Sequence, residues 1–404
     1  MRRIAIIGAG AAGCFCAVQL RRMAPDADIS IFEASSRPMA KLAVTGGGRC
    51  NLSNDFQGIR SLSEAYPRGE RVMQRALKAF SQDDTIRWFT QQGVPCVLQE
   101  DHCWFPRSQD AMDVVRCLER GMKGTHLRLN TAVRLLSKDR GAFELAIKKA
   151  DAPSNESLSF DAVVVTTGGA AKGLPFLAPL GLDLIAPVPS LFTFTVPDAR
   201  LRSLMGLVVD ASVSLPGTSF KAQGPLLITD WGLSGPAILK LSSYAARYLA
   251  ETGYRGSVAI NWFNQSEAAV RDLLQETADR NPQKQLATTH LLQSRLWEHL
   301  LEKALLRPDL RWAELGNKGL NKLTSILTHD CYPVAGKSRF RNEFVTAGGV
   351  ALSNIDLSTL ECKRHKGLFF AGEVLDIDAI TGGFNLQAAW STGYVCAQSI
   401  VKSL

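Results

Sequence analysis

The stretch RRIAIIGAGAAG, residues 2–13, decides the fold class of this chain. Four apolar residues, 4–7, predict a buried strand, and the turn that follows carries Gly8, Gly10 and Gly13 in the G-x-G-x-x-G spacing. In a dinucleotide-binding turn the first glycine permits the tight bend and the second lets the backbone approach a pyrophosphate. The third lets helix and strand pack closely. The pattern therefore predicts a Rossmann-like α/β fold.

The surroundings of this turn make the glycine spacing specific. A helical pattern covers about 11–23, with Ala12 in its first turn, and a second short strand, 29–32, ends at Glu33. The N-terminus of such a helix offers free N–H groups and a positive dipole to phosphates. The Glu33 carboxylate can accept hydrogen bonds from ribose hydroxyls, and its charge repels a 2′-phosphate. A glycine-rich turn in a nucleotide-free α/β fold is the alternative.

The composition indicates a globular protein with two or three domains. The chain has 404 residues, nine cysteines without a C-x-x-C pair, and a formal net charge of +8. No apolar run reaches the roughly eighteen residues of a membrane helix, and the histidines and cysteines have no metal-site spacing. Unpaired cysteines favour a reducing, cytoplasmic location. The basic excess suits an anionic cofactor, an anionic substrate or nucleic acid, and taken alone it does not choose among them.

A second glycine-rich stretch, KLAVTGGGRCNLSN at 41–54, is incompatible with a regular helix or strand. Three consecutive glycines are followed directly by Arg49, Cys50 and Asn51. A backbone bare of side chains is expected where a ligand lies against it. The stretch therefore marks a candidate binding loop.

Later segments fit the same ligand-binding domain. Strands expected at about 126–130, 133–137 and 142–149 form a meander, and FDAVVVTTGG, from Phe160, is a buried strand that ends in a Thr-Thr-Gly-Gly turn. The segment GLFFAGEVLDIDAITGGFNLQAAWSTG, 367–393, predicts a strand, a loop with two glycines and a C-terminal helix. FAD-binding doubly wound folds place such a meander before a strand with an A-T-G-type turn. With a single dinucleotide fingerprint in the chain, this order favours FAD.

The chain resembles the bacterial FAD-dependent oxidoreductases grouped as BaiN/YhiN-like, over essentially its whole length. The motifs that carry the resemblance are GAGAAG at 8–13, KLAVTGGGRCNLSN at 41–54, WFPRS at 104–108, TTGG at 166–169, GLSGPAILKLS at 232–242, TAGGV at 346–350 and the segment from Gly367. The group includes aminoacetone oxidase-like flavoproteins and reductases linked to bile-acid dehydroxylation. The resemblance implies FAD in a two-dinucleotide-binding-type domain that is interrupted by an inserted domain.

The resemblance also implies a set of cofactor-binding residues in this sequence. They are Gly8, Gly10, Ala12 and Gly13 at the first turn, Glu33, then Lys41, Gly46, Gly47, Gly48, Arg49 and Cys50 at the glycine loop, Val133 in the meander, Thr167 and Gly168 after the buried strand, and Gly372, Glu373, Gly383, Asn385 and Leu386 near the last helix. Val133 would meet adenine through its backbone. The N–H groups that open the last helix would face the N1/C2=O edge of the flavin, where a helix N-terminus stabilises negative charge.

Arg49 and Cys50 each allow two interpretations. Arg49 either anchors the loop or faces an anionic group. Cys50 invites a redox role, but a lone cysteine without a resolving partner is more often a small packing residue.

The resemblance and the strand pattern together predict the domain organisation. The FAD domain is expected at 1–185 and 334–404, an inserted β-rich, barrel-like domain at 186–265, and a helical subdomain at 266–333.

Acid–base residues are not identified by the sequence. The resembled group usually has Thr-His before GLSGP, whereas this chain has Thr229 and Asp230, so a catalytic histidine at that position is absent. His329, Asp330 and Tyr332 lie where the chain returns to the FAD domain. They are either acid–base candidates or part of a hydrogen-bonded hinge.

A row of cations raises the question of nucleic acid. Arg68, Arg71, Arg75 and Lys78 follow one another at spacings of three and four, which places them along one helix face. The row either contacts an anion or a nucleic acid, or it is a solvated face. No aromatic-plus-basic RNA module is visible, which disfavours nucleic acid as a partner.

These features favour an FAD-dependent oxidoreductase that transfers a hydride through flavin N5 to or from a small organic substrate. NAD(P)H would dock transiently as electron donor, since no second fingerprint provides an NAD domain, or oxygen would accept the electrons. A flavin-dependent RNA-modifying enzyme and a non-catalytic flavin-binding sensor are the two alternatives.

Overall fold

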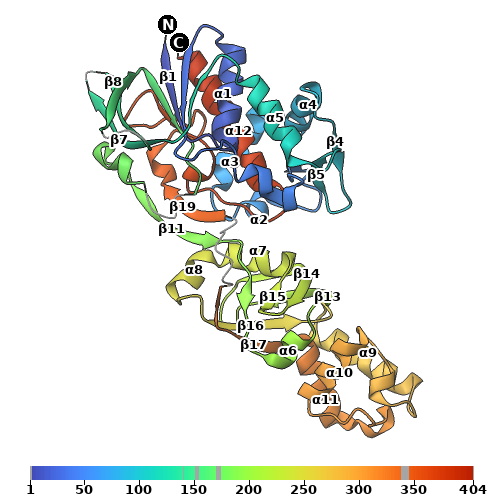
Figure 1. Cartoon of the computed structure of the whole chain (residues 1–404). Coiled ribbons are helices and arrows are strands. Elements are labelled where there is room, and N and C mark those ends of the chain that lie inside the picture. The colour runs from blue at the N-terminus through green and yellow to red at the C-terminus, as the bar shows by residue number, and fades with distance from the viewer. Residues whose placement is uncertain (1, 140, 151–153, 170–173, 338–344, 404) are drawn as a thin grey trace. The chain divides into compact units, whose positions relative to one another are not determined.

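The computed structural model describes residues 2–139, 141–150, 154–169, 174–337 and 345–403 (Figure 1). The chain divides into two compact units. Unit 1 comprises Met1–Pro189 and Val345–Leu404, and unit 2 comprises Ser190–Phe344. The N-terminal glycine turn and the last helix therefore belong to the same unit, although almost the whole sequence separates them.

A five-stranded sheet in the order β20-β10-β1-β2-β6 forms the centre of unit 1, and all its neighbouring strands are parallel. Its strands are β1 (Arg3–Ile7), β2 (Asp28–Phe32), β6 (His126–Arg128), β10 (Ala162–Val165) and β20 (Leu368–Phe370). In β1 the four residues from Ile4 to Ile7 are all buried, as expected for a parallel strand that is covered on both faces. The predicted Rossmann-like α/β fold is confirmed.

The helices of unit 1 are α1 (Ala11–Met23), α2 (Leu62–Ala65), α3 (Glu70–Ala79), α4 (Gln82–Gln91), α5 (Ala111–Gly121) and α12 (Phe384–Lys402). Helices α1 and α12 pack against the five-stranded sheet, and the other helices of unit 1 surround them. Helices α1 and α12 approach closely, because Gly393 leaves room for the backbone of α1: a Cβ atom there would lie 2.8 Å from the Ala12 carbonyl oxygen. Within the described part of the chain, no helix combines the length and apolar character needed to cross a bilayer.

Three small sheets complete unit 1. They are β3 (Ser53–Asn54) with β4 (Cys96–Leu98) and β5 (Cys103–Pro106), β7 (Thr131–Asp139) with β8 (Ala142–Lys149) and β9 (Glu156–Phe160), and β11 (Leu184–Ser190) with β19 (Val345–Val350). The β7-β8-β9 sheet is the meander, but the prediction of its first strand at 126–130 was wrong. Residues 126–128 pair in parallel with β2 instead and form the edge strand of the main sheet.

Unit 2 contains a seven-stranded sheet in the order β17-β16-β13-β14-β15-β12-β18. Its strands are β12 (Phe194–Thr195), β13 (Val208–Ser214), β14 (Lys221–Thr229), β15 (Gly232–Ser234), β16 (Gly256–Asn261), β17 (Asp330–Val334) and β18 (Gly336–Lys337). Its helices are α6 (Ala199–Ser203), α7 (Pro236–Tyr244), α8 (Ala246–Glu251), α9 (Glu267–Arg280), α10 (Ser294–Lys303) and α11 (Gly316–Thr328). One hydrophobic core joins the sheet and helices α9 to α11, and it includes Trp262, Trp297 and Trp312.

Candidate functional site

The first turn of unit 1 is closed tightly on itself. Gly8 has a φ of +107°, and a Cβ there would lie 2.5 Å from the Thr166 carbonyl oxygen. A Cβ on Gly13 would lie 2.1 Å from the Gly8 carbonyl oxygen, whereas a Cβ on Gly10 would meet no atom within 4 Å. The Thr166 hydroxyl donates to the carbonyls of Ile7 and Gly8, at 3.1 and 2.8 Å. Strand β10 therefore fixes the turn, and Gly10 keeps an open side.

Glu33 is fixed beside this turn at the end of β2. One carboxylate oxygen accepts the Ala9 N–H at 2.9 Å. The other accepts the backbone N–H of Ser35 at 2.8 Å and its hydroxyl at 2.7 Å. The carboxylate is thus held in place by donors of the protein, in the position where ribose hydroxyls were predicted to meet it.

The glycine loop at 42–48 is an interrupted 3-10 segment. Gly46, Gly47 and Gly48 have φ values of +58°, +70° and +84°, a region that side-chain-bearing residues rarely adopt. A Cβ on Gly47 or Gly48 would meet no atom within 4 Å. Lys41, which precedes the segment, is exposed. The glycines are thus required by backbone conformation, and the loop leaves open space beside it.

Arg49 and Cys50 close this loop in different ways. The Arg49 Nε–H donates to the Gly46 carbonyl at 3.2 Å, and its guanidinium lies over the Phe105 ring, 4.4 Å from the centroid. Cys50 is fully buried, and burial raises the pKa of its thiol to about 12. A thiol with this pKa is protonated near neutral pH and is a poor nucleophile, which argues against a redox role.

The TTGG turn, the 372–373 turn and helix α1 come together in unit 1. A Cβ on Gly169 would lie 2.6 Å from a Glu373 carboxylate oxygen, and that oxygen accepts the Thr346 N–H at 2.7 Å. Gly168 has a φ of +72°, and Thr167 beside it is exposed. These predicted residues lie on one side of the parallel sheet, at the carboxyl ends of its strands, where doubly wound folds bind ligands.

Gly372 connects this turn to both long helices. Its N–H donates to the Thr392 hydroxyl of α12 at 2.9 Å. A Cβ there would lie 2.9 Å from the Cβ of Ala12 in α1, and the φ of Gly372 is +75°. Only glycine fits between the helices at this point.

The N-terminus of α12 is braced from several directions. Gly383, with a φ of +89°, packs so closely that a Cβ would lie 2.4 Å from the Ser53 carbonyl oxygen. The Tyr66 hydroxyl donates to the Phe384 carbonyl at 2.9 Å. The Asn385 side chain both accepts from and donates to the backbone of Ala379, at 3.0 Å each. The side chain of Asn385 is therefore a loop brace, and only backbone N–H groups of Asn385 and Leu386 remain for a ligand.

Sequence reasoning missed one buried ion pair next to this helix. The Arg68 guanidinium forms a two-pronged pair with the Asp378 carboxylate, whose side chain is 0% exposed. In the row of cations, Arg75 bonds to Ser358, so the row does not form one free face. No local signal in the sequence pairs Arg68 with a residue more than three hundred positions away.

Val133 lies in β7, an edge strand of the meander with a register shift between Val133 and Leu135. An edge strand has backbone groups without a strand partner on one side. The adenine contact through the Val133 backbone stays a prediction that this geometry permits.

The remaining candidates lie in unit 2. Tyr332 bonds through its hydroxyl to His299 Nε2 at 3.0 Å, and Asp330 accepts from Trp262 Nε1 at 3.1 Å and pairs with Lys303. Burial lowers the pKa of His299 and raises the pKa of Tyr332. His329 and Asp230 are exposed. Asp330 and Tyr332 thus take part in a buried network of unit 2, which fits the hydrogen-bonded interpretation.

Comparison with known families adds to this geometry. Residues 2–399 match the family model described as the HI0933-like protein Rossmann domain. The chain belongs to the HI0933-like family. It is a flavoprotein oxidoreductase of that family, as its fold and motifs predicted.

Curated relatives of this HI0933-like protein extend over its full length. The 3-dehydro-bile acid delta(4,6)-reductase of Clostridium scindens is 29% identical over 100% of both chains. Two ribosomal RNA dihydrouridine synthases, from Haemophilus influenzae and Escherichia coli, are 28% and 29% identical, with 98% of each chain covered. Two of these three relatives act on RNA, whereas the sequence alone favoured a small-molecule substrate.

Solved structures share the fold of this family member. A 3-ketosteroid delta1-dehydrogenase from Sterolibacterium denitrificans covers 100% of both chains with a TM-score of 0.52 and 13% identity. An E. coli quinol fumarate reductase chain covers 100% of this chain and 71% of its own length, with a TM-score of 0.50 and 15% identity. At these identities the likeness concerns the fold.

The residues of unit 1 fit the FAD that the family binds. Open backbone at Gly10, Gly47 and Gly48 accommodates a ligand without displacing protein atoms. The starts of α1 and α12 leave backbone N–H groups without intrahelical partners, the kind of donors that bind phosphate and other negative charge. Among the described residues, no group of histidine, cysteine and carboxylate side chains could hold a metal ion. The nineteen-residue cofactor set stays a prediction; the Asn385 side chain is engaged by Ala379, so its backbone N–H is the group left for a ligand.

Proposed function

We propose that this chain is an FAD-dependent reductase that saturates a carbon–carbon double bond conjugated to a carbonyl group. The observation that carries the proposal is the shared chemistry of its full-length relatives. A 3-dehydro Δ4,6 bile acid and a uridine are unrelated molecules, yet each has a C=C bond in conjugation with a ring carbonyl. A delta(4,6)-reductase and a dihydrouridine synthase both remove such bonds. Relatives that share a fold and a cofactor but differ in their substrate pockets are expected to catalyse the same reaction on different substrates.

The chain's own residues would bind and orient the cofactor. The first turn, from Gly8 to Gly13, would receive the pyrophosphate, and Glu33 the adenosine ribose. The braced N-terminus of α12 would meet the N1/C2=O edge, where its dipole stabilises negative charge. When bound, FAD supplies the hydride at N5. The glycine loop would leave the reacting face free of side chains.

The electron donor is proposed to be NADH or NADPH. The only dinucleotide fingerprint in the sequence belongs to the FAD turn, so the donor would dock transiently at the flavin. The reaction then balances: the donor supplies a hydride, solvent supplies a proton, and both add across the C=C bond.

The test is an anaerobic visible spectrum of the purified holoprotein. We expect NADH or NADPH to bleach the oxidised flavin, and a conjugated enone such as cyclohex-2-enone to restore the colour. A flavin that neither nicotinamide reduces would point to the sensor alternative or to an oxidase whose own substrate reduces it. A flavin that is reduced but is reoxidised only by oxygen would contradict C=C reduction.

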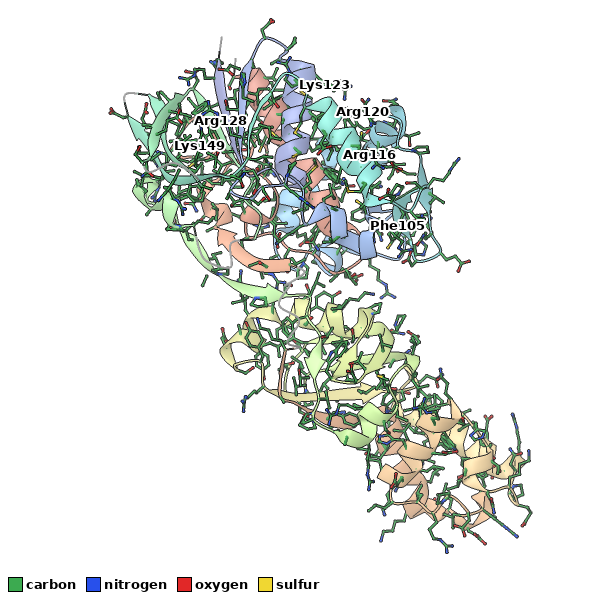
Figure 2. The ribbon with its side chains drawn as sticks, viewed as in Figure 1. Phe105, Arg116, Arg120, Lys123, Arg128 and Lys149 are labelled. Carbon is green, nitrogen blue, oxygen red and sulfur yellow. The ribbon has the colours of Figure 1, made fainter. Side chains whose placement is uncertain are left out.

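A uracil base within RNA is the second candidate substrate, and two observations favour it. Two of the curated relatives act on ribosomal RNA. Figure 2 shows Arg116, Arg120 and Lys123 following one another along and just beyond α5, where all three are exposed. Arg116 is paired with Asp113 at 2.7 Å, so Arg120 and Lys123 contribute most of the free charge.

The RNA candidate is tested by binding and by product analysis. We expect a ribosomal RNA fragment to bind with an affinity that falls steeply as salt rises, and to gain dihydrouridine on incubation with NADH or NADPH. Salt-independent binding, or RNA without dihydrouridine, would leave the small-molecule substrate.

A further inference from the structure

We infer that Arg49 is a binding subsite for an anionic group of the substrate, a carboxylate or a phosphate, beside the glycine loop. The inference rests on the proposed function and names the chemical class of its substrate. It is carried by how Arg49 is held, by the charges around it, and by the open space at the loop.

Arg49 is held by neutral partners only. Its Nε–H donates to the Gly46 carbonyl at 3.2 Å, and Nη1 lies 3.5 Å from the Gln109 side-chain oxygen. Its guanidinium carbon lies 4.4 Å from the centroid of the Phe105 ring. Figure 2 shows Phe105 near the β5 end of unit 1. These contacts orient the guanidinium without neutralising it.

The partners of Arg49 are themselves fixed. Phe105 is 2% exposed. The Gln109 oxygen also accepts from the Gln99 side chain at 3.1 Å, and the Gln109 amide donates to the Pro106 carbonyl at 3.0 Å. A cation whose support is rigid loses little side-chain freedom when an anion binds, and a planar guanidinium presents paired donors to carboxylate or phosphate.

Arg49 forms no ion pair with its own loop or with the turn between β5 and α5, where Asp110 pairs with Arg116 instead. Among the residues that the structure describes, no carboxylate pairs with Arg49. The sequence from 34 to 54 contains Arg37, Lys41 and Arg49, and no aspartate or glutamate. By contrast, Arg68 has Asp378 and Arg116 has Asp113. An oriented cation that lacks an acidic partner is suited to an anion brought by a ligand.

Open space lies beside this cation. Arg49 is exposed, and Cβ atoms placed on Gly47 or Gly48 would meet nothing within 4 Å. The contacts of Arg49 belong to the turn between β5 and α5 and to its own loop, and none goes to the 8–13 turn that is proposed to receive the FAD pyrophosphate. The guanidinium is therefore not engaged by the turn proposed to bind the cofactor pyrophosphate, and it remains available to an anionic group of the substrate.

Anion titration of the oxidised holoprotein tests the inference without requiring turnover. Inorganic phosphate and succinate are added at constant ionic strength, and the flavin absorbance change is followed. We expect a saturable change in the wild type, and for Arg49→Gln a rise in the apparent Kd of about ten-fold or more. Arg107→Gln is the matched control, since Arg107 is an exposed arginine on the turn between β5 and α5 that supports Arg49. This variant should change the Kd by less than about two-fold.

Two outcomes would overturn the inference. One is a weaker FAD affinity in Arg49→Gln with unaltered anion binding, which would assign Arg49 to the cofactor pyrophosphate. The other is the absence of any saturable anion effect in the wild type. Both differ from a failure of the proposed function, which would show as the absence of enone reduction by protein that still responds to anions.

The source of the anion is resolved by turnover with paired substrates. Cyclohex-2-enone, which is neutral, serves as the internal reference, so that any effect of Arg49→Gln on FAD itself cancels in the ratio of charged to neutral substrate. If the anion is a phosphate, uridine monophosphate should lose about ten-fold in kcat/KM in the variant relative to uridine; if it is a carboxylate, a cyclic enone that carries a carboxylate should show that loss. Arg49→Lys, which keeps the charge, should recover part of the affinity. Equal losses for charged and neutral substrates would mean that Arg49 only shapes the loop.

Discussion

Unit 1 contains two glycine clusters that look alike in sequence and differ in structure. In the first turn, Gly8 and Gly13 touch protein backbone so closely that Cβ atoms there would lie 2.5 and 2.1 Å from carbonyl oxygens. In the loop at 46–48, Gly47 and Gly48 face open space and need glycine only because φ is positive. Glycine is therefore required in the first cluster by packing within the protein. In the second cluster it is required by the loop conformation and by the ligand that binds beside the loop.

The same difference between packed and open glycines occurs within the first cluster, where Gly10 is the open one. It lies between Gly8 and Gly13 in sequence, yet a Cβ there would meet no protein atom within 4 Å. Within a single motif, two glycines thus serve packing and one keeps room for a ligand. The comparison can be tested because packing glycines affect the apoprotein, and ligand glycines affect only the complex.

The largest effect is expected for Gly13→Ala. The added methyl would clash with the Thr166 hydroxyl at 2.5 Å and with the Gly8 carbonyl oxygen at 2.1 Å, and that backbone carbonyl cannot move without opening the β1–α1 turn. We expect no folded protein, because contacts this short exceed the overpacking that costs a core about 1–3 kcal/mol. Chemical denaturation of the apoprotein measures this. Gly10→Ala is the control, and it should keep the stability of the apoprotein while lowering its affinity for FAD. An equal loss of apoprotein stability in both variants would contradict the distinction between packed and open glycines.

The next largest effect concerns the segment that leads into α12. Asp378→Asn leaves the Arg68 guanidinium without its carboxylate in a site where the two side chains are 12% and 0% exposed. A broken buried pair costs about 3–5 kcal/mol, measurable as a lowered denaturation midpoint. The double variant Arg68→Met with Asp378→Leu should recover much of this loss. Additive losses in the double variant would show that the two residues act separately.

Gly48→Ala should have a smaller effect than either change. Its φ of +84° strains a side-chain-bearing residue, at a cost of about 1–2 kcal/mol, and no clash adds to it. The apoprotein should therefore stay folded, while FAD affinity, measured by flavin fluorescence on titration, should fall. If apoprotein stability fell as much as in Gly13→Ala, the loop would be part of the packed fold after all.

The smallest effect is expected at Cys50. Because burial raises the pKa of this thiol to about 12, iodoacetamide at pH 8 should label the exposed Cys331 long before Cys50, as peptide mass spectrometry would show. Cys50→Ser should leave turnover of the FAD-bound enzyme unchanged. Rapid alkylation of Cys50 in the folded protein would restore the redox interpretation.

The raised pKa also has a consequence for stability. The thiol titrates near 9 when unfolded and about 12 in the fold, so its stabilising contribution is complete below pH 9. It is lost as pH rises from 9 to 12, because the unfolded state then releases the proton first. Denaturation curves in this pH window should be less steeply pH-dependent for Cys50→Ser than for the wild type.

Local patterns predicted much of unit 1. The strand at 4–7, its glycine turn and the helix that follows are short-range features, because turn geometry and burial on both faces restrict residue type position by position. The strand at 126–130 was assigned to the wrong sheet, since a short strand pattern does not specify which strand it pairs with. Asn385 stays a predicted cofactor residue through its backbone N–H, and the structure adds that its side chain braces Ala379, a contact that no local pattern indicated.

The sequence by itself determined the fold class, the family and the two segments, 8–13 and 46–48, where the backbone must lack side chains. Glycine spacing, strand length and apolar runs act locally and can be recognised without a partner. Only the tertiary structure decided which glycines are packed and which are open, that Arg68 meets Asp378, that Cys50 is buried, and that Arg49 has neutral partners. Those properties depend on contacts between residues far apart in sequence, and no local pattern encodes such contacts.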